Sequence, residues 1–181
     1  RESARLAAER LSAAHPSMRV LGVAMQVDQV PSIRDAFAQA RAAFGRLDAF
    51  VANAAHLGVG LSVFTTTQAD WDAVMNVNAR GIFFGCQEAV RIMAENGGGA
   101  ICLISSVHAH AAVPERVAYA ASKGAINAMA RAVAVEVGHL NIRVNALVAG
   151  AIWSERWAGQ PAEVTAARRA QYPLGRESRP E

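Results

Sequence analysis

The chain has 181 residues, of which 52% are hydrophobic and 18% are charged, as is typical of one folded domain with a real core and not of a disordered segment. Its formal net charge of +3 comes from scattered arginines without interleaved aromatic residues, which argues against nucleic-acid binding. No apolar run approaches the roughly 20 residues that span a bilayer, so no membrane segment is expected.

The first part of the chain alternates between helical and strand patterns. Apolar residues recur at helical spacing over residues 1–15, which predicts an amphipathic helix. The apolar run RVLGVAMQV at 19–27 predicts a buried strand, and one apolar face over 31–44, ended by Gly45, predicts a second helix. The short run LDAFVA predicts the next strand at 47–52.

The second part continues this alternation. A long helix is expected over residues 68–95, and the apolar run AICLIS predicts a strand at 100–105. A helix over roughly 116–138 and a strand over 142–148 follow. The tail from residue 151 onward is polar and rich in arginine, and it contains at most one helix.

The order of these elements predicts the fold class. Apolar strands that alternate with helices indicate an α/β protein with a parallel sheet covered on both sides, wound in three layers by right-handed crossovers. In such doubly wound sheets, ligands bind beyond the carboxyl ends of the strands. That rule selects three candidate site segments, which are Asn53–Ala55, Ser105–Ser106 and Ala149–Gly150.

Tyr119 and Lys123 form a candidate catalytic pair. They lie four residues apart in the run YAASK on a predicted helix, so their side chains share one face. A free phenol ionises at about pH 10, but a neighbouring ammonium favours the phenolate and makes tyrosine a usable general acid/base. The same spacing also fits an ordinary surface tyrosine and lysine.

Ser106 supplies a third candidate group. It ends a predicted strand thirteen residues before Tyr119, and the chain then returns across the top of the sheet into the helix. A hydroxyl there can hydrogen-bond a substrate oxygen beside the tyrosine. A serine that only satisfies a loop is the plainer interpretation, and Ser105 fits that role equally well.

Taken together, Ser106, Tyr119, Lys123 and Ser122 resemble the active-site motif of the short-chain dehydrogenase/reductase family. The run WDAVMNVNARGIFF is similar to the family's V-N-x-x-G segment and places its fourth catalytic residue at Asn78. The resemblance spans nearly the whole chain and implies a Rossmann-like fold. It also implies that Asn78 sits at a helix irregularity and holds a water for a proton relay.

Further segments resemble the family's site for NAD or NADP. The run FVANAA is similar to the N-N-A-G motif, with alanine at two of its positions, and NALVAGAIWS is similar to the segment that contacts the nicotinamide. An aspartate in MQVDQV matches the family's adenine contact. The resemblance therefore implies a cofactor site made by Asp28, Asn53, Ala54, Ala55, Tyr119, Lys123, Gly150, Ile152 and Ser154.

Parts of the family's fold have no counterpart in this sequence. The first two strands, the glycine-rich turn that holds the pyrophosphate, and the last strand are absent. Residues 1–181 are thus expected to form a partial domain, with 150–181 as its substrate-loop region. The family's sheet order puts two absent strands between 19–27 and 47–52, so we expect a gap or an abnormal pairing there, with exposed apolar edges.

The resemblance implies an NAD(P)-dependent oxidoreductase that interconverts a secondary alcohol and a ketone by hydride transfer. Candidate substrates are a 3-oxoacyl thioester, a sugar or polyol, and a steroid-like or other secondary alcohol. The alternative is an inactive fragment, or a non-catalytic relative of the fold that acts by protein contacts. A cytoplasmic location is expected, because Cys86 and Cys102 form no C-x-x-C pair and fit a reducing compartment. A homodimer or homotetramer is expected, because the helices at 68–95 and 116–138 are the family's usual subunit faces.

Histidines and tryptophans near these motifs have weaker interpretations. His108 and His110 form an H-x-H pair after Ser106, but no third ligand is evident, and no metal is expected. They line the substrate mouth or lie in a loop. His56 is a further candidate for the substrate side, and Trp153 and Trp157 either wall an apolar pocket or cover the core.

Overall fold

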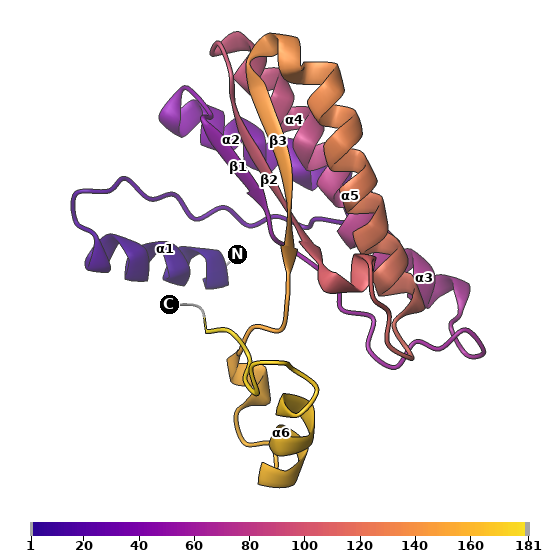
Figure 1. Ribbon diagram of the computed structural model, residues 1–181. Helices are drawn as coiled ribbons and strands as arrows, with labels where there is room; N and C mark the ends of the chain where they lie inside the picture. The colour runs from indigo at the N-terminus through magenta and orange to yellow at the C-terminus, as the bar shows by residue number, and fades with distance from the viewer. Residues whose placement is uncertain (1, 180–181) are drawn as a thin grey trace.

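The computed structural model describes residues 2–179, and its centre is a three-stranded parallel sheet in the order β1-β2-β3. The strands are β1 (Ala49–Ala52), β2 (Gly99–Ser106) and β3 (Ile142–Ala149) (Figure 1). In the longer pairing, Gly99 lies opposite Ile142 and Ser106 lies opposite Ala149. Because all three strands run in one direction, their carboxyl ends meet at the same edge of the sheet.

Helices alternate with these strands as expected. The separate helices are α1 (Glu2–Ala14), α2 (Val30–Phe44), α5 (Val117–Val137) and α6 (Ala162–Arg169). A composite helix joins β1 to β2 and consists of α3 (Gln68–Met75), the π-helical turn η1 (Asn76–Gly81) and α4 (Ile82–Glu95). Short 3-10 turns are η2 (Val107–Ala109), η3 (Gly138–Leu140) and η4 (Glu155–Trp157). No helix within residues 2–179 is both long enough and apolar enough to cross a bilayer.

Local sequence signals explain where two of these helices begin and end. Pro31 lies in the first turn of α2, and Gly45 ends this helix at a left-handed φ of 79°, with its N–H donating to the Arg41 carbonyl at 2.7 Å. Helix α3 begins with a reciprocal cap, in which the Asp70 N–H donates to the Thr67 hydroxyl and the Thr67 N–H donates to the Asp70 carboxylate.

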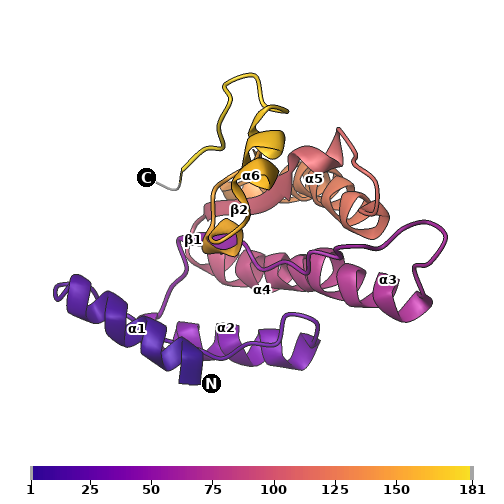
Figure 2. The same ribbon diagram turned by 90° about the horizontal axis from the view of Figure 1, so that it is seen from below.

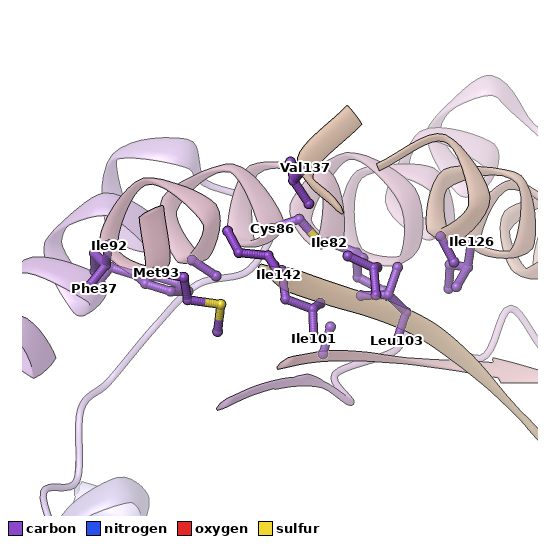
Figure 3. Close-up of a cluster of buried hydrophobic side chains, with 14 of the residues drawn as sticks. Phe37, Ile82, Cys86, Ile92, Met93, Ile101, Leu103, Ile126, Val137 and Ile142 are labelled. Carbon is purple, nitrogen blue, oxygen red and sulfur yellow. The ribbon is translucent and has the colours of Figure 1, made fainter. Parts of the chain in front are cut away.

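A single apolar core lies between the sheet and helices α2, α4 and α5 (Figure 3). Seen from below, these helices lie side by side along the sheet (Figure 2). Cys86 belongs to this core, and burial raises the pKa of its thiol to about 12. The other large core side chains are Ile33, Phe37, Ile82, Ile92, Met93, Ile101, Leu103, Ile126, Val137, Ile142 and Val144.

The opposite face of the sheet has no helical cover within residues 2–179. Ala52 and Val144 point into the core, whereas Val51 and Leu147 are 59% and 50% exposed. The α/β class and the parallel sheet are confirmed. The expected third layer does not form in this part of the chain, because α2, α4 and α5 all contribute to one core on one face.

The strand expected at residues 19–27 is not formed. This segment runs as an extended coil between α1 and α2 (Figure 1), and Leu21 and Met25 are 43% and 40% exposed. A strand needs a neighbour for its backbone N–H and C=O groups, and no described strand lies beside this segment. The expected gap between 19–27 and β1, with exposed apolar side chains, is therefore confirmed.

Close backbone contacts hold the extended segment in place of strand pairing. A Cβ atom on Gly22 would lie 2.2 Å from the Ala4 carbonyl oxygen of α1, and a Cβ atom on Gly81 would lie 2.2 Å from the Val27 carbonyl oxygen. Only glycine permits such approaches. The segment thus packs α1 at one end and the π-helical turn at the other.

Candidate active site

The two serines at the carboxyl end of β2 have different surroundings. Ser105 is buried, and its hydroxyl donates to the Lys123 carbonyl of α5 at 3.1 Å. The Ser106 hydroxyl accepts the His108 N–H at 3.3 Å, so its own proton remains available to a further acceptor. Ser105 therefore ties the strand to the helix, and Ser106 is the serine that can meet a ligand.

Tyr119 and Lys123 lie on one face of α5, as their spacing predicts. The Lys123 ammonium is 5.6 Å from the centre of the Tyr119 ring and donates to the Ile104 carbonyl of β2 at 2.6 Å. Lys123 is only 2% exposed, and this desolvation lowers its pKa. The sheet and helix thereby hold a buried cation beneath the phenol.

Asn78 lies in the π-helical turn η1, which confirms that it sits at a helix irregularity. Its amide oxygen accepts the His56 N–H at 2.7 Å, and its amide nitrogen donates to the His56 carbonyl at 2.9 Å and to the Ser122 hydroxyl at 3.0 Å. The Ser122 hydroxyl in turn donates to the Tyr119 carbonyl at 2.7 Å. Asn78 is fully buried and connects the loop after β1 to the helix that bears Tyr119.

Ser106 and Tyr119 open into one cleft of about 740 Å³ at the carboxyl edge of the sheet. This volume is in the range of small-molecule sites. Gly150 and Ile152, two of the residues expected to bind cofactor, also line it. The cleft is bounded by Leu57, Val107, His108, Ala111, Ala112, Val113, Arg116, Ala151, Trp157, Gln171 and Tyr172.

The other expected cofactor residues lie outside this lining. Asn53, Ala54 and Ala55 follow β1 directly and are exposed at the same edge of the sheet, and Asp28 lies in the turn before α2. The Ser154 hydroxyl is buried and has no hydrogen-bond partner among the described residues. An unsatisfied hydroxyl near Gly150 and Ile152 fits a polar group of a bound nicotinamide, as the resemblance implies.

Arg116 and Tyr172 are cleft residues that the sequence analysis did not single out. Arg116 precedes α5 by one residue and lies one helical turn before Tyr119, a spacing that was available as a signal. Tyr172 comes from the tail, where no periodic pattern links it to the motif residues. Its position depends on how the tail folds back.

The tail forms a small ordered wall of the cleft. Ile152 bridges to Ser178, and the carboxylate of Glu177 accepts bonds from Arg168 at 2.6 Å and from Arg169 at 2.8 Å. The Arg168 guanidinium stacks over the Trp157 ring at 4.2 Å from its centre. These contacts place Trp157 and Tyr172 at the cleft.

The remaining histidines and tryptophans take separate places. His108 lines the cleft and lies edge-on to the Tyr119 ring, with the two ring centres 5.9 Å apart. His110 instead bonds through its Nε2 to the side-chain Nδ2 of Asn127 at 3.0 Å. No group of three His, Cys, Asp or Glu side chains in the described chain is placed to hold a metal. His56 is outside the cleft lining, and of the two tail tryptophans only Trp157 belongs to the lining among the described residues.

Comparison with known proteins identifies the family that the chain is similar to. A family model described as enoyl-(acyl carrier protein) reductase matches residues 1–181. The chain is 37% identical over 166 residues to the inactive 2-(S)-hydroxypropyl-CoM dehydrogenase 2 of Xanthobacter autotrophicus, which covers 88% of the chain and 72% of that protein. It is 37% identical over 111 residues to levodione reductase of Leifsonia aquatica, which covers 61% of the chain but only 42% of that protein.

A solved structure shows the same arrangement of elements. The crystal structure of a protein from Sinorhizobium meliloti 1021, provisionally described as a short-chain alcohol dehydrogenase, superposes with a TM-score of 0.87 at 31% sequence identity. The superposition covers 96% of this chain and 69% of that one. The superposition thus extends over nearly all of this chain, and every one of these matches covers only part of the relative's own length, from 42% to 72%.

Proposed function

The chain belongs to the short-chain dehydrogenase/reductase family, and from this premise we propose that the protein is an NAD(P)-dependent oxidoreductase that interconverts a secondary alcohol and a ketone. The observation that supports this best is the shared cleft of Ser106 and Tyr119, with the buried Lys123 ammonium beneath the phenol ring. A hydroxyl donor, a proton-transferring phenol and a fixed cation are the groups that such a reaction needs.

Ser106 and Tyr119 act on the substrate oxygen. The Ser106 hydroxyl accepts the His108 N–H and keeps its own proton, with which it donates a hydrogen bond that orients this oxygen. Tyr119 gives the oxygen a proton when a ketone is reduced and takes it back when an alcohol is oxidised. When the nicotinamide cofactor is bound, it supplies or accepts the hydride.

Lys123 acts through the electrostatic field of its ammonium. At 5.6 Å from the ring centre and 2% exposed, the charge is screened far less than a surface charge, so it stabilises negative charge that develops on the Tyr119 oxygen during proton transfer. The Ile104 carbonyl accepts from one of its three N–H donors, and the other two have no partner among the described residues, which leaves them for the ribose contact that the family resemblance implies.

Asn78 has a positioning role in this scheme, and the water relay stays a proposal. Both polar ends of its amide already bond to His56 and Ser122. A relay water there would use the second lone pair of the amide oxygen or the backbone of the π-helical turn.

The cofactor is NAD or NADP, held along the carboxyl edge of the sheet. Gly150 and Ile152 line the cleft, and the Ser154 hydroxyl, which has no partner among the described residues, would offer a donor and an acceptor to the carboxamide. Asn53–Ala55 and Asp28 extend the proposed contacts toward the adenosine half of the cofactor.

Replacement of Tyr119 by Phe tests the proposed chemistry. We expect the turnover number to fall by about 10²- to 10⁴-fold, because the variant loses the proton donor and acceptor but keeps the ring. Initial rates with a panel of secondary alcohols and ketones, with each nicotinamide cofactor, measure this. Tyr172→Phe is the matched control, since it removes the other phenol hydroxyl of the same cleft. Equal turnover by Tyr119→Phe and the unaltered protein would contradict the mechanism.

A non-catalytic protein that acts by protein contacts is the second candidate. One similar protein is itself named as inactive, and no glycine-rich phosphate turn occurs in the 181 residues. Cofactor binding discriminates between the two. Saturable quenching or enhancement of NADH or NADPH fluorescence supports the enzyme, whereas none at millimolar cofactor supports the second candidate.

We further propose a cytoplasmic homodimer or homotetramer with a small-molecule substrate and no metal. The composite helix of α3, η1 and α4 and the helix α5 would supply the subunit faces, as the family resemblance implies. Sedimentation analysis at several protein concentrations tests the oligomeric state, and a monomer at high micromolar concentration would refute it.

A further inference from the structure

Arg116 is a fixed cation at the proposed substrate site. Among the described residues that line the cleft, it alone carries a permanent charge, since Lys123 lies buried beneath the Tyr119 ring. Its guanidinium carbon is 6.0 Å from the centre of that ring. Arg116 and Tyr119 line the same cleft, so a ligand that contacts Tyr119 there lies in the field of this cation.

The backbone and one hydrogen bond hold Arg116 in position. Its Nη1 donates to the Leu57 carbonyl at 2.9 Å, and its backbone bridges to Leu61, so the loop after β1 anchors it from one side. Glu115, the residue before it, has a left-handed φ of 60°, which turns the chain into α5 at this point. Such anchoring reduces the entropy lost when a ligand binds.

Most of the guanidinium remains without a described partner. A guanidinium has five N–H donors, and only the bond to Leu57 is formed within the described residues. No described carboxylate lies within ion-pair distance of Arg116, although Arg5, Arg41 and other surface arginines have such partners. Within the described part of the chain, Arg116 is thus an anchored guanidinium with no carboxylate partner and no other permanent charge in the cleft lining, and such a group is complementary to an anion.

We propose that Arg116 binds an anionic group of the substrate, so that the protein acts on ketones and alcohols that bear a carboxylate, sulfonate or phosphate. This inference rests on the proposed function and specifies its substrate class. The fork of N–H donors suits an oxyanion with two or three oxygens. The reacting carbonyl would lie at Ser106 and Tyr119, with the anion at Arg116.

Paired acids and esters test the proposal. Acetoacetate and levulinate are compared with their uncharged methyl esters as substrates of the unaltered protein, Arg116→Gln and Arg116→Lys. We expect the unaltered protein to prefer the acids. Arg116→Gln should lower kcat/KM for the acids by about 10- to 100-fold, the size of a charged hydrogen-bonded contact, and leave the esters nearly unchanged. Arg116→Lys keeps the positive charge but loses the fork of N–H donors, so its kcat/KM for the acids should lie between those of the unaltered protein and Arg116→Gln.

Arg131→Gln is the matched control, because it removes the same charge from an exposed position on the same helix. It should behave like the unaltered protein toward both acids and esters. An equal loss for acids and esters in Arg116→Gln, or no preference for acids in the unaltered protein, would overturn the inference.

A binding measurement separates this inference from the proposed function. Saturation-transfer NMR with levulinate and its methyl ester needs no turnover. If no substrate reacts but levulinate binds in an Arg116-dependent manner, the proposed function fails and the anion site stands. If ketones are reduced but neither rate nor binding depends on Arg116, the proposed function stands and the anion site is refuted.

Discussion

Lys123 combines an unfavourable position for stability with a favourable one for chemistry. It is the only lysine in the chain, and the fold buries its ammonium with a single described hydrogen bond, to Ile104. Burial lowers its pKa, which means that the charged form is held at a cost in folding free energy. The arrangement is understandable if the charge acts on Tyr119 and on a bound ligand.

The pH dependence of stability reports this cost. The pKa of Lys123 is 10.5 in an unfolded chain and lower in the fold, so the unfolded chain binds more protons as the pH approaches 10.5. The free energy of unfolding should therefore rise over that window, while at lower pH the cost is constant. Lys123→Met should remove the rise and abolish activity.

Urea denaturation of the unaltered protein and Lys123→Met between about pH 7 and 10.5 measures the difference. Because the chain has one lysine, [15N]lysine labelling should also give one ammonium signal whose titration follows the folded pKa directly. An identical slope in both proteins, or a titration at the ordinary value, would contradict the prediction.

The π-helical turn shows how an element is shaped by what packs against it. Its extra residue per turn directs Asn78 inward to His56 and Ser122, and Gly81 at its end leaves room for the backbone of Val27. The turn thus connects the extended segment 19–27 to the loop and helix of the proposed site.

Two glycine replacements test this packing. In Gly81→Ala the new methyl would lie 2.2 Å from the Val27 oxygen, and we expect a loss of about 1–3 kcal/mol in the free energy of unfolding. Gly124→Ala is the control, since this helical glycine of α5 has nothing within 4 Å of the new methyl, and it should gain about 0.5–1 kcal/mol. Denaturant unfolding measures both, and equal effects would show that the close approach is not structurally important.

At the scale of the whole molecule, the tail completes the cleft through ion pairs. Glu177 is 5% exposed and accepts bonds from Arg168 and Arg169, and the first of these stacks over Trp157. A backbone hydrogen bond and these two guanidinium groups lower the pKa of Glu177 to about 2 from its ordinary 4.5. The wall formed by Trp157 and Tyr172 therefore depends on one carboxylate.

Acid and Glu177→Gln should both loosen this wall. A carboxylate with a lowered pKa contributes its full stabilisation above about pH 4.5 and loses it as the pH falls toward about 2. At neutral pH, Glu177→Gln should increase tryptic cleavage after Arg168 and Arg169 severalfold, because the open form of the tail becomes more populated. Glu163→Gln, at an exposed position on α6, should cleave like the unaltered protein. Equal cleavage of all three proteins would contradict the assigned role.

The sequence alone determined the kind and order of nearly all the elements and the parallel α/β class. These features, and the shared helix face of Tyr119 and Lys123, follow from spacing along the chain, because helical and strand periodicity and the positions one turn apart on a helix are local properties. The grouping of Ser106 and Asn78 with that pair in one catalytic site is what the family resemblance implies, and it stays a prediction. The irregularity at Asn78 was implied by the resemblance of its segment to the family, and the π-helical turn confirms it.

Only the tertiary structure decided which contacts join distant segments. It left residues 19–27 without a strand partner and brought Arg116 and Tyr172 into the cleft. It also gave the two adjacent serines different roles, with Ser105 bonded to α5 and Ser106 facing the cleft. Strand pairing and cleft lining depend on which other segments lie alongside, so a short apolar run is a strand only where a neighbour satisfies its backbone. That neighbour cannot be read from the run itself.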